Sequence, residues 1–255
     1  TNKKAKGKKG SIVAIFSGTK VEPIIEQLMK ISNKKRDMVK EITLDMANSM
    51  KTIAKKCFPK AVQVTDRFHV QKLALEALQD IRIKHRWDAI DQENEHIKRA
   101  KEKNRAFVPK EFSNGDTRKQ LLARSRYLLY KSPNNWTPNQ SERSRILFSQ
   151  YPDIKLAFEL VQGLRHIFNT ATTIQVAYTK LAHWYKDVEN TGFRAFNTIA
   201  NTISLNYRSI LNYFINRSTN ASAESFNAKI KAFRTQFRGV RNTEFFLFRL
   251  TQLFA

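Results

Sequence analysis

The sequence predicts an α/β fold in which helices predominate. Its 255 residues include only seven Gly and six Pro, which argues against a turn-rich all-β sandwich. Strand-like runs occur near the start, and helical periodicities fill most of the remainder. A hydrophobic content of 41%, with 18 Phe, seven Tyr and three Trp, is enough for a sizeable core, so wholesale disorder is excluded.

The start of the chain predicts a basic turn, a strand and a helix. Residues 1–10 contain five Lys and two Gly, which indicates a solvated basic turn or tail. The run 11–17, Ser-Ile-Val-Ala-Ile-Phe-Ser, is short, apolar and partly β-branched, which predicts a buried strand. Apolar residues at 21, 24, 25, 28, 29 and 31 follow Thr19, a candidate cap, with the spacing of an amphipathic helix.

The next segment predicts two parallel strands. Strand-like stretches at 39–45 and 61–66 end in Asp45 and Asp66, and a helix-like stretch at 47–57 lies between them. The connection between the strands is too long for a hairpin and suits a crossover, so both strands point the same way. The two aspartates would then lie at one carboxyl edge, where open α/β sheets place their sites. Each aspartate could instead cap the helix that follows it.

Beyond Asp66 the sequence shows mostly helical periodicities separated by polar breaks. Predicted helices cover 68–103, 116–130, 139–149, 152–168, 170–187, 191–201 and 204–216. A further helix begins near Ser222, a break follows at 238–239, and an apolar helix begins at Asn242. The organisation is therefore strands first and helices afterwards.

Charge is the second strong signal. The chain has 46 Lys and Arg against 22 Asp and Glu, a formal net charge of +24, which points to a polyanionic partner. Between Glu189 and Glu244 the only acidic residue is Glu224. Eight basic residues surround it: Arg194, Arg208, Arg217, Lys229, Lys231, Arg234, Arg238 and Arg241. A surface that holds phosphates should exclude carboxylates unless a metal ion lies between the two.

The predicted helix around Glu224 supports two interpretations. Its apolar positions recur at helical spacing and predict a buried stripe, formed by Phe226, Ile230, Phe233 and Phe237, with Glu224 on another, polar face. Glu224 could be a metal ligand. It could equally be a first-turn glutamate favoured by the helix dipole, or a partner of Lys231.

Cysteine content and hydropathy indicate the cellular compartment in which the protein is expected to act. A single cysteine, Cys57, excludes an intrachain disulfide framework and fits a reducing compartment. No run of about 18 apolar residues and no leader-like start occur, so we expect a cytoplasmic protein that does not act at a membrane. Because the start also lacks Met, we expect the chain to be a fragment of a longer protein.

Three groups of residues resemble the DDE-type bacterial insertion-sequence transposases of the ISL-three family. The first group is Leu44-Asp45-Met46-Ala-Asn-Ser-Met, Cys57-Phe58-Pro59-Lys60-Ala61 and Val64-Thr65-Asp66-Arg67-Phe68-His69-Val70. The second is Leu128-Leu-Tyr-Lys-Ser-Pro133, Trp136-Thr-Pro-Asn-Gln140 and Tyr151-Pro152. The third is Arg217-Ser-Thr-Asn220-Ala-Ser-Ala-Glu224-Ser-Phe-Asn227-Ala-Lys229-Ile-Lys231 with Gly239-Val-Arg241-Asn242. The resemblance spans nearly the whole chain.

The resemblance implies a ribonuclease-H-like core, truncated at its N-terminus and interrupted by a large all-α insertion. Residues 1–70 would form the first part of the core, 71–216 the insertion, and 217–255 the catalytic helix with a closing helix. Asp45 matches the family's second catalytic aspartate and Glu224 its glutamate, which makes them the implied metal ligands. Asp66 and His69 match an accessory Asp-x-x-His pair. Which of the two aspartates binds metal directly stays open, with Asp45 favoured.

The implied activity is that of a DNA transposase: Mg²⁺-dependent phosphodiester hydrolysis followed by DNA strand transfer, with Mn²⁺ as a substitute. The family's first aspartate has no counterpart here, so we expect it upstream of residue 1 and expect this chain to be inactive alone. The implied partners are transposon ends and target DNA, bound by a homo-oligomer in the bacterial cytoplasm, associated with the nucleoid. The first candidates for DNA contact are Arg217, Lys229, Lys231, Arg234, Arg238 and Arg241. The alternative is a basic helical protein that binds nucleic acid without cleaving it.

Overall fold

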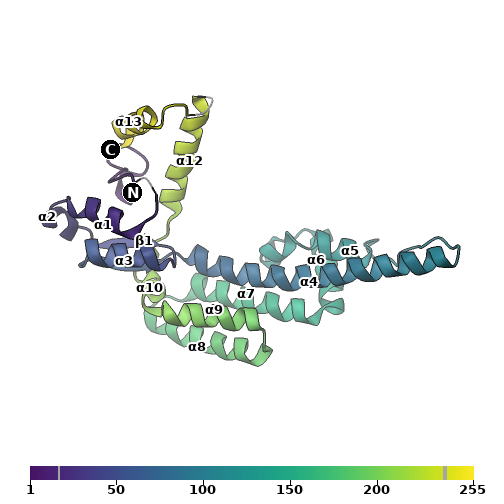
Figure 1. Cartoon of the computed structure of the whole chain (residues 1–255). Helices are drawn as coiled ribbons and strands as arrows, with labels where there is room; N and C mark the ends of the chain where they lie inside the picture. The colour runs from purple at the N-terminus through teal and green to yellow at the C-terminus, as the bar shows by residue number, and fades with distance from the viewer. Residues whose placement is uncertain (17, 238–239) are drawn as a thin grey trace. The chain divides into compact units, whose positions relative to one another are not determined.

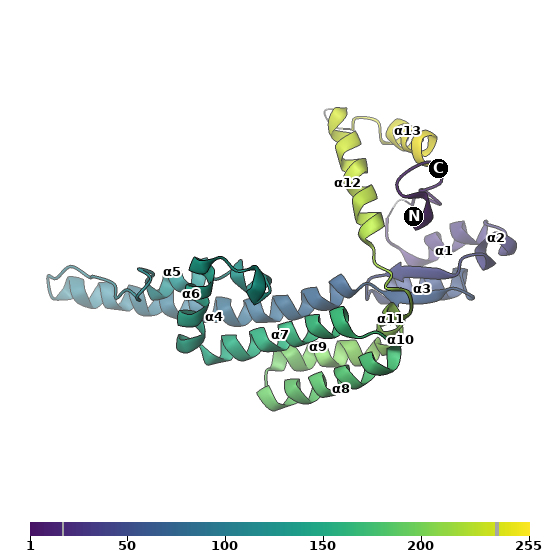
Figure 2. The same cartoon turned by 180° about the vertical axis from the view of Figure 1, so that it is seen from behind.

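The computed structural model describes residues 1–16, 18–237 and 240–255, and Figures 1 and 2 show it from opposite sides. The chain divides into two compact units. The first unit combines Thr1–His69 with Asn206–Ala255, and the second is Val70–Leu205. Each unit is described by itself. As predicted, the described residues are mostly helical with a small sheet.

The sheet of the first unit has two parallel strands, β1 (Glu41–Leu44) and β2 (Val62–Thr65). Helix α3 (Asn48–Cys57) connects them as a crossover. Register pairs run from Glu41 with Val62 to Leu44 with Thr65. The predicted strand, helix and strand, and their parallel direction, are confirmed.

Two helices precede the sheet. Helix α1 (Val21–Met29) packs on α3, and the contact buries Ile24 and Leu28 against Ile53 and Cys57. The predicted helix over 21–31 is confirmed. A short helix, α2 (Asn33–Asp37), holds the buried Arg36, whose guanidinium donates hydrogen bonds to the carbonyl oxygens of Ile31 (3.0 Å) and Cys57 (2.7 Å). The bond to Cys57 satisfies the last carbonyl group of α3 from outside that helix.

The predicted buried strand at 11–17 is wrong for the residues described there. Residues 11–16 form no strand; Ser17 lies outside the described part of the chain. The side chains of Val13 and Ile15 are 57% and 40% exposed. The N–H of Ile12 donates instead to the carbonyl oxygen of Phe254 at 2.8 Å. A strand needs a neighbouring strand for its hydrogen bonds, and the described sheet has two strands that pair only with each other.

The basic start of the chain is not a free tail. Residues Lys3–Ala5 form a short 3-10 helix, η1, capped by the side chain of Asn2. The Lys3 ammonium donates to the Thr43 hydroxyl on β1 and lies 3.8 Å from a Glu41 carboxylate oxygen. Burial lowers the pKa of Lys3, while the negative charges of Glu41 and Asp66 oppose that shift. Lys3 therefore joins this basic start to β1, while most of residues 1–10 are exposed, as predicted for a solvated basic turn.

The C-terminal part of the first unit begins with two short helices, α10 (Tyr207–Leu211) and α11 (Tyr213–Asn216). Helix α10 packs on β2, and Figure 2 shows both short helices beside the strands. Two longer helices follow, α12 (Ala221–Gln236) and α13 (Thr243–Phe254). They confirm the predicted helices near Ser222 and from Asn242, and the predicted break at 238–239 lies outside the described residues.

The second unit is helical. Its helices are α4 (Arg67–Glu102, which begins in the first unit), α5 (Arg118–Arg124), α6 (Pro138–Gln150), α7 (Pro152–Thr170), α8 (Ile174–Thr191) and α9 (Arg194–Leu205). Short 3-10 turns, η2 (Leu128–Tyr130) and η3 (Pro133–Asn135), join α5 to α6. Figure 1 shows α7, α8 and α9 side by side, and Phe168 and Phe196 are fully buried in the core. The helices match the predicted ones with two exceptions. Helix α5 and η2 replace one longer helix at 116–130, and the end of α9 with α10 and α11 replaces one helix at 204–216.

A buried carboxylate organises one corner of the second unit. The Asp116 side chain is fully buried and accepts hydrogen bonds from Arg143 (2.7 Å), from Asn114 (2.9 Å) and from Arg124. Burial acts to raise the pKa of Asp116, but the two guanidinium groups outweigh it and hold that pKa below its usual value. Asp116 thus joins the loop before α5 to α5 and α6.

In the part of the chain that is described, no helix is long and apolar enough to cross a membrane.

Candidate active site

Two aspartates lie at the carboxyl edge of the sheet. Leu44 pairs with Thr65 at the last register position, and Asp45 and Asp66 are the next residues of the two strands. The N–H of Asp66 donates to the carbonyl oxygen of Leu44 at 3.0 Å, which extends the pairing by one step. The structure therefore brings both aspartates to one edge, as the crossover predicted.

Asp45 is half-buried at the start of the turn into α3. Its Oδ1 accepts a hydrogen bond from the N–H of Ala47 at 3.0 Å, so the helix-capping alternative is realised in part. Its Oδ2 accepts no hydrogen bond from the described residues, and neither oxygen has an ion-pair partner among them. Burial lowers the pKa of Lys51, one turn into α3, and the Asp45 charge opposes that shift. One Asp45 oxygen thus stays available to a ligand.

Asp66 is 2% exposed and uses both carboxylate oxygens. Oδ1 accepts from the N–H of Phe68 at 3.0 Å, which caps the first turn of α4. Oδ2 accepts from the N–H of Asn220 at 2.8 Å, in the segment that leads into α12. The N–H of His69 donates to the Asp66 carbonyl oxygen at 3.1 Å, and its half-buried ring lies edge-on to Phe68 at 5.7 Å between centroids.

Glu224 lies in the first turn of α12, and its side chain is exposed. Its N–H donates to the carbonyl oxygen of Asn220 at 2.9 Å and closes that turn. Glu224 therefore has the first-turn position in which the helix dipole favours a negative charge, as one of the two interpretations predicted. The alternative ion pair with Lys231 is not formed: Glu224 has no cation within 4.0 Å among the described residues.

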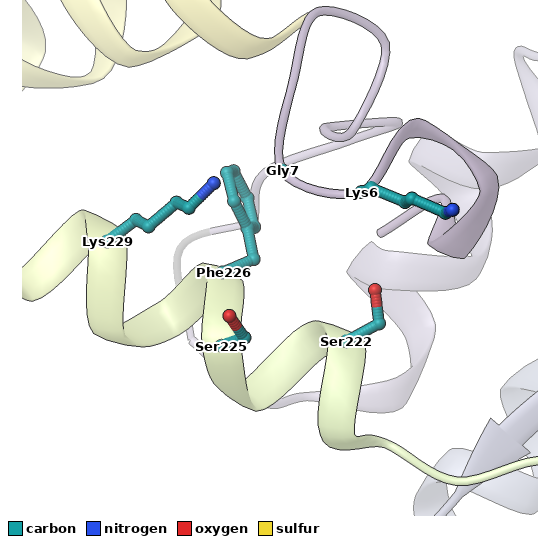
Figure 3. A pocket seen from close by; sticks show the side chains of 6 residues that line it. All are labelled: Lys6, Gly7, Ser222, Ser225, Phe226 and Lys229. Carbon is teal, nitrogen blue, oxygen red and sulfur yellow. The ribbon is translucent and has the colours of Figure 1, made fainter.

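The flank of α12 contacts the basic start of the chain. A cavity of about 130 Å³ lies there, lined by Lys6, Gly7, Ser222, Ser225, Phe226 and Lys229 (Figure 3). Phe226 and Lys229 point toward the segment that contains Gly7. The Lys229 ammonium lies only 2.9 Å from where a Cβ of residue 7 would be, and Gly7 has a φ of +72°. Gly7 therefore fits here both by backbone conformation and by close approach.

The predicted buried stripe on α12 is only partly correct. Phe226 is 2% exposed and meets Phe254 of α13 edge-on at 5.0 Å between ring centroids. Phe233 stacks on Phe246 at 5.8 Å but is half-buried, and Phe237 is 43% exposed. The stripe faces α13 as its spacing requires, yet a single helix covers too little of it to bury the far end.

The basic candidates for DNA contact are exposed where they are described: Arg217, Lys229, Lys231, Arg234 and Arg241. Arg238 lies outside the described residues. Arg217 has a φ of +54° and its guanidinium lies over the rings of Tyr213 (5.7 Å) and Phe214 (5.8 Å), so part of this side chain also packs on the protein.

The donor chemistry fits a hard divalent cation. Asp45 and Glu224 offer carboxylate oxygens, which Mg²⁺ prefers, and neither is neutralised by a described Lys or Arg. No group of three or more His, Cys, Asp or Glu side chains suited to a metal ion occurs within the described ranges. Metal binding by Asp45 and Glu224 therefore stays a prediction.

Several contacts of the two strands were not predictable from the sequence. The Thr65 and Ser209 hydroxyls lie 2.8 Å apart, the Asn212 amide donates to the Gln63 carbonyl oxygen at 2.9 Å, and the Asn216 amide donates to Glu41 at 3.1 Å. Each joins the sheet to α10, to α11 or to Asn212 between them. The partners are 144 to 175 positions apart, so no local pattern signals them.

Comparison with known proteins gives one family. The family model for DDE transposases of the ISL3 type, described as Transposase, matches residues 2–250. Two relatives, both named transposase for insertion sequence element IS1557, come from the CDC 1551 / Oshkosh and H37Rv strains of Mycobacterium tuberculosis. Each is 30% identical over 135 residues, which cover 51% of this chain and 29% of the relative. No solved structure matches.

Proposed function

The chain belongs to the DDE transposases of the ISL-three family, and from this premise we propose that it supplies two carboxylates of a Mg²⁺-dependent DNA strand-transfer site. Asp45 and Glu224 are those carboxylates, with Asp66 and His69 as an accessory pair. The observation that carries the proposal is the pair of aspartates at one sheet edge, together with Glu224 in a basic segment, where it has no ion-pair partner among the described residues.

The architecture supports a ribonuclease-H-like core. Parallel strands with their carboxylates at one edge come first, a helical unit at 70–205 follows, and α12 with Glu224 returns to the first unit. This is the chain order that the family resemblance implies, with the helical unit as the insertion. The family pattern has a third carboxylate, so we propose that Asp45 and Glu224 alone do not complete the site.

The proposed roles follow from side-chain chemistry. Asp45 and Glu224 hold Mg²⁺, which when bound activates the attacking oxygen and stabilises the leaving oxygen at a DNA phosphate. The half-buried Asp45 is oriented by the N–H of Ala47, which leaves its other oxygen for the metal. Exposed basic residues, led by Lys231 and Arg234, neutralise the DNA backbone and fix its position without reading its sequence. Such a protein acts as an assembly of copies on paired transposon ends and target DNA.

The test uses the full-length transposase with its transposon-end DNA. Asp45→Asn and Glu224→Gln should each lower cleavage and strand transfer by about a thousandfold, because each removes a metal ligand worth several kcal/mol of transition-state stabilisation. DNA binding should change less than about threefold. Glu244→Gln is the matched control, since Glu244 is an exposed first-turn glutamate of α13 and should leave both activities intact.

A non-catalytic nucleic-acid-binding protein is the second candidate, favoured by the net charge of +24. Under that reading, Asp45→Asn and Glu224→Gln leave the function of the full-length protein unchanged. Retained strand transfer in both variants would therefore replace the catalytic proposal with this one.

A further inference from the structure

The inference concerns Asp66, and it rests on the proposed function. We propose that Asp66 is a positioning residue that holds the first turn of α12, and with it Glu224, at the carboxyl edge of the sheet. It does so through its own two oxygens rather than by binding metal. Asp66 and Asp45 thus have different roles although they occupy equivalent strand ends.

The hydrogen bonds of Asp66 connect two segments that are far apart in the sequence. Oδ1 accepts from Phe68, two residues on, and Oδ2 accepts from Asn220, 154 residues on. A carboxylate is suited to this geometry because it has two acceptor oxygens and no donor. An Asn amide would turn an N–H group toward one of the two backbone N–H groups. Because the acceptor is a carboxylate, both bonds are charge-assisted and strong.

The link to Glu224 is one helical turn long. Asn220 precedes α12 and makes no side-chain cap for it, so its backbone is not fixed by its own side chain. The Asn220 N–H donates to Asp66, and the Asn220 carbonyl oxygen accepts from the N–H of Glu224 at 2.9 Å. Moving Asn220 therefore moves the turn that presents the Glu224 carboxylate.

The burial of Asp66 separates it from Asp45. Asp66 is 2% exposed and both its oxygens already accept N–H groups, whereas Asp45 is half-buried and accepts one N–H on one oxygen. A metal ligand needs a free, reachable oxygen, which Asp45 has.

Amide hydrogen exchange on the full-length protein tests the clamp without any activity measurement. Asp66→Asn should speed exchange of the Glu224 amide about tenfold to a hundredfold, the factor for losing one hydrogen bond to a charged group. Asn220→Pro removes the donor instead, at a residue whose φ of −82° is close to that of proline, and should have the same effect. Asp45→Asn is the control and should leave that amide unchanged.

The double variant Asp66→Asn with Asn220→Pro should exchange no faster than either single variant, because both remove the same bond. Additive effects on the exchange rate would overturn the proposed positioning role of Asp66. So would an unchanged exchange rate of the Glu224 amide in either folded single variant. Using both variants keeps the test open if one of them fails to fold.

A thiol substitution separates positioning from ligation. Asp45→Cys should lose strand transfer with Mg²⁺ and regain it with Mn²⁺, which tolerates sulfur better than Mg²⁺. The Asp66→Cys variant should show impaired strand transfer with both Mg²⁺ and Mn²⁺, and its affinity for DNA should be unchanged. Rescue of Asp66→Cys by Mn²⁺ would make Asp66 a ligand and overturn the proposal. If Asp45→Asn keeps full strand transfer, the proposed function fails, while the exchange experiment still decides the clamp.

Discussion

Replacing Asp116 with Ala should destabilise the second unit more than any loss of a surface ion pair. The carboxylate is fully buried and accepts from Arg143, Arg124 and Asn114, so the substitution removes three hydrogen bonds, two of them from charged groups. It also leaves the Arg143 side chain, which is 20% exposed, without its anion. Removing one partner of such a buried pair costs about 3–5 kcal/mol.

The assay is urea unfolding followed by circular dichroism, with Glu95→Ala as the control. Glu95 pairs with Arg99 on α4 at 3.3 Å, and both side chains are 68% exposed, so its loss should cost about 0.5 kcal/mol. Asp116→Ala should lower the unfolding free energy by about 4 kcal/mol, by comparison. Equal, small losses in both variants would refute the view that Asp116 organises this corner.

Acid unfolding tests how the contribution of Asp116 to stability changes with pH. Because the folded-state pKa of Asp116 lies below its usual value, its contribution is complete above the unfolded pKa of about 3.9 and is lost as the pH falls through the lower folded pKa. The difference in stability between wild type and Asp116→Asn should therefore be constant near neutral pH and shrink below about pH 4. A difference that stays constant down to pH 2 contradicts this.

Two further predictions concern the first unit. Gly7→Ala should cost about 1 kcal/mol, measured by urea unfolding, because residue 7 has a φ of +72°. Adding Lys229→Ala to Gly7→Ala should recover little of that loss, since the lysine ammonium that approaches Gly7 is at the end of a flexible side chain. Full recovery would show that the loss comes from the contact with Lys229 and not from the backbone conformation. Lys231→Ala in the full-length protein should weaken DNA binding equally for different sequences and lower the salt slope of log affinity by about one, measured by titration at several salt concentrations. An unchanged slope would remove Lys231 from the interface.

The fold was predictable where its signals are local. The strands at 41–44 and 62–65 and the intervening helix follow from apolar runs and from the length of the crossover. The run 11–17 has the same local character, yet a strand also requires a partner that local sequence does not specify. Helix α2 was missed because Asn-Lys-Lys-Arg-Asp has no apolar periodicity. The bond that Arg36 donates to the Cys57 carbonyl oxygen joins residues 21 positions apart, so no local pattern signals it.

The placement of two aspartates at one sheet edge was predictable from the sequence, whereas the metal-binding role of Glu224 stays a prediction. Parallel strands placed Asp45 and Asp66 together, and charge contrast selected Glu224. The bond from Asn220 to Asp66 was not predictable, because it joins residues 154 positions apart. The same holds for the contact of Lys3 with Thr43 and Glu41 on β1, which charge patterning does not signal.

Anomalous diffraction from Mn²⁺-soaked crystals of the full-length transposase tests the central claim most directly. We predict anomalous density coordinated by carboxylate oxygens of both Asp45 and Glu224, with Asp66 still bonded to the Asn220 N–H and outside the metal's ligands. Density at Asp66 in place of Asp45, or carboxylates of Asp45 and Glu224 too far apart to share bound metal, would contradict the account.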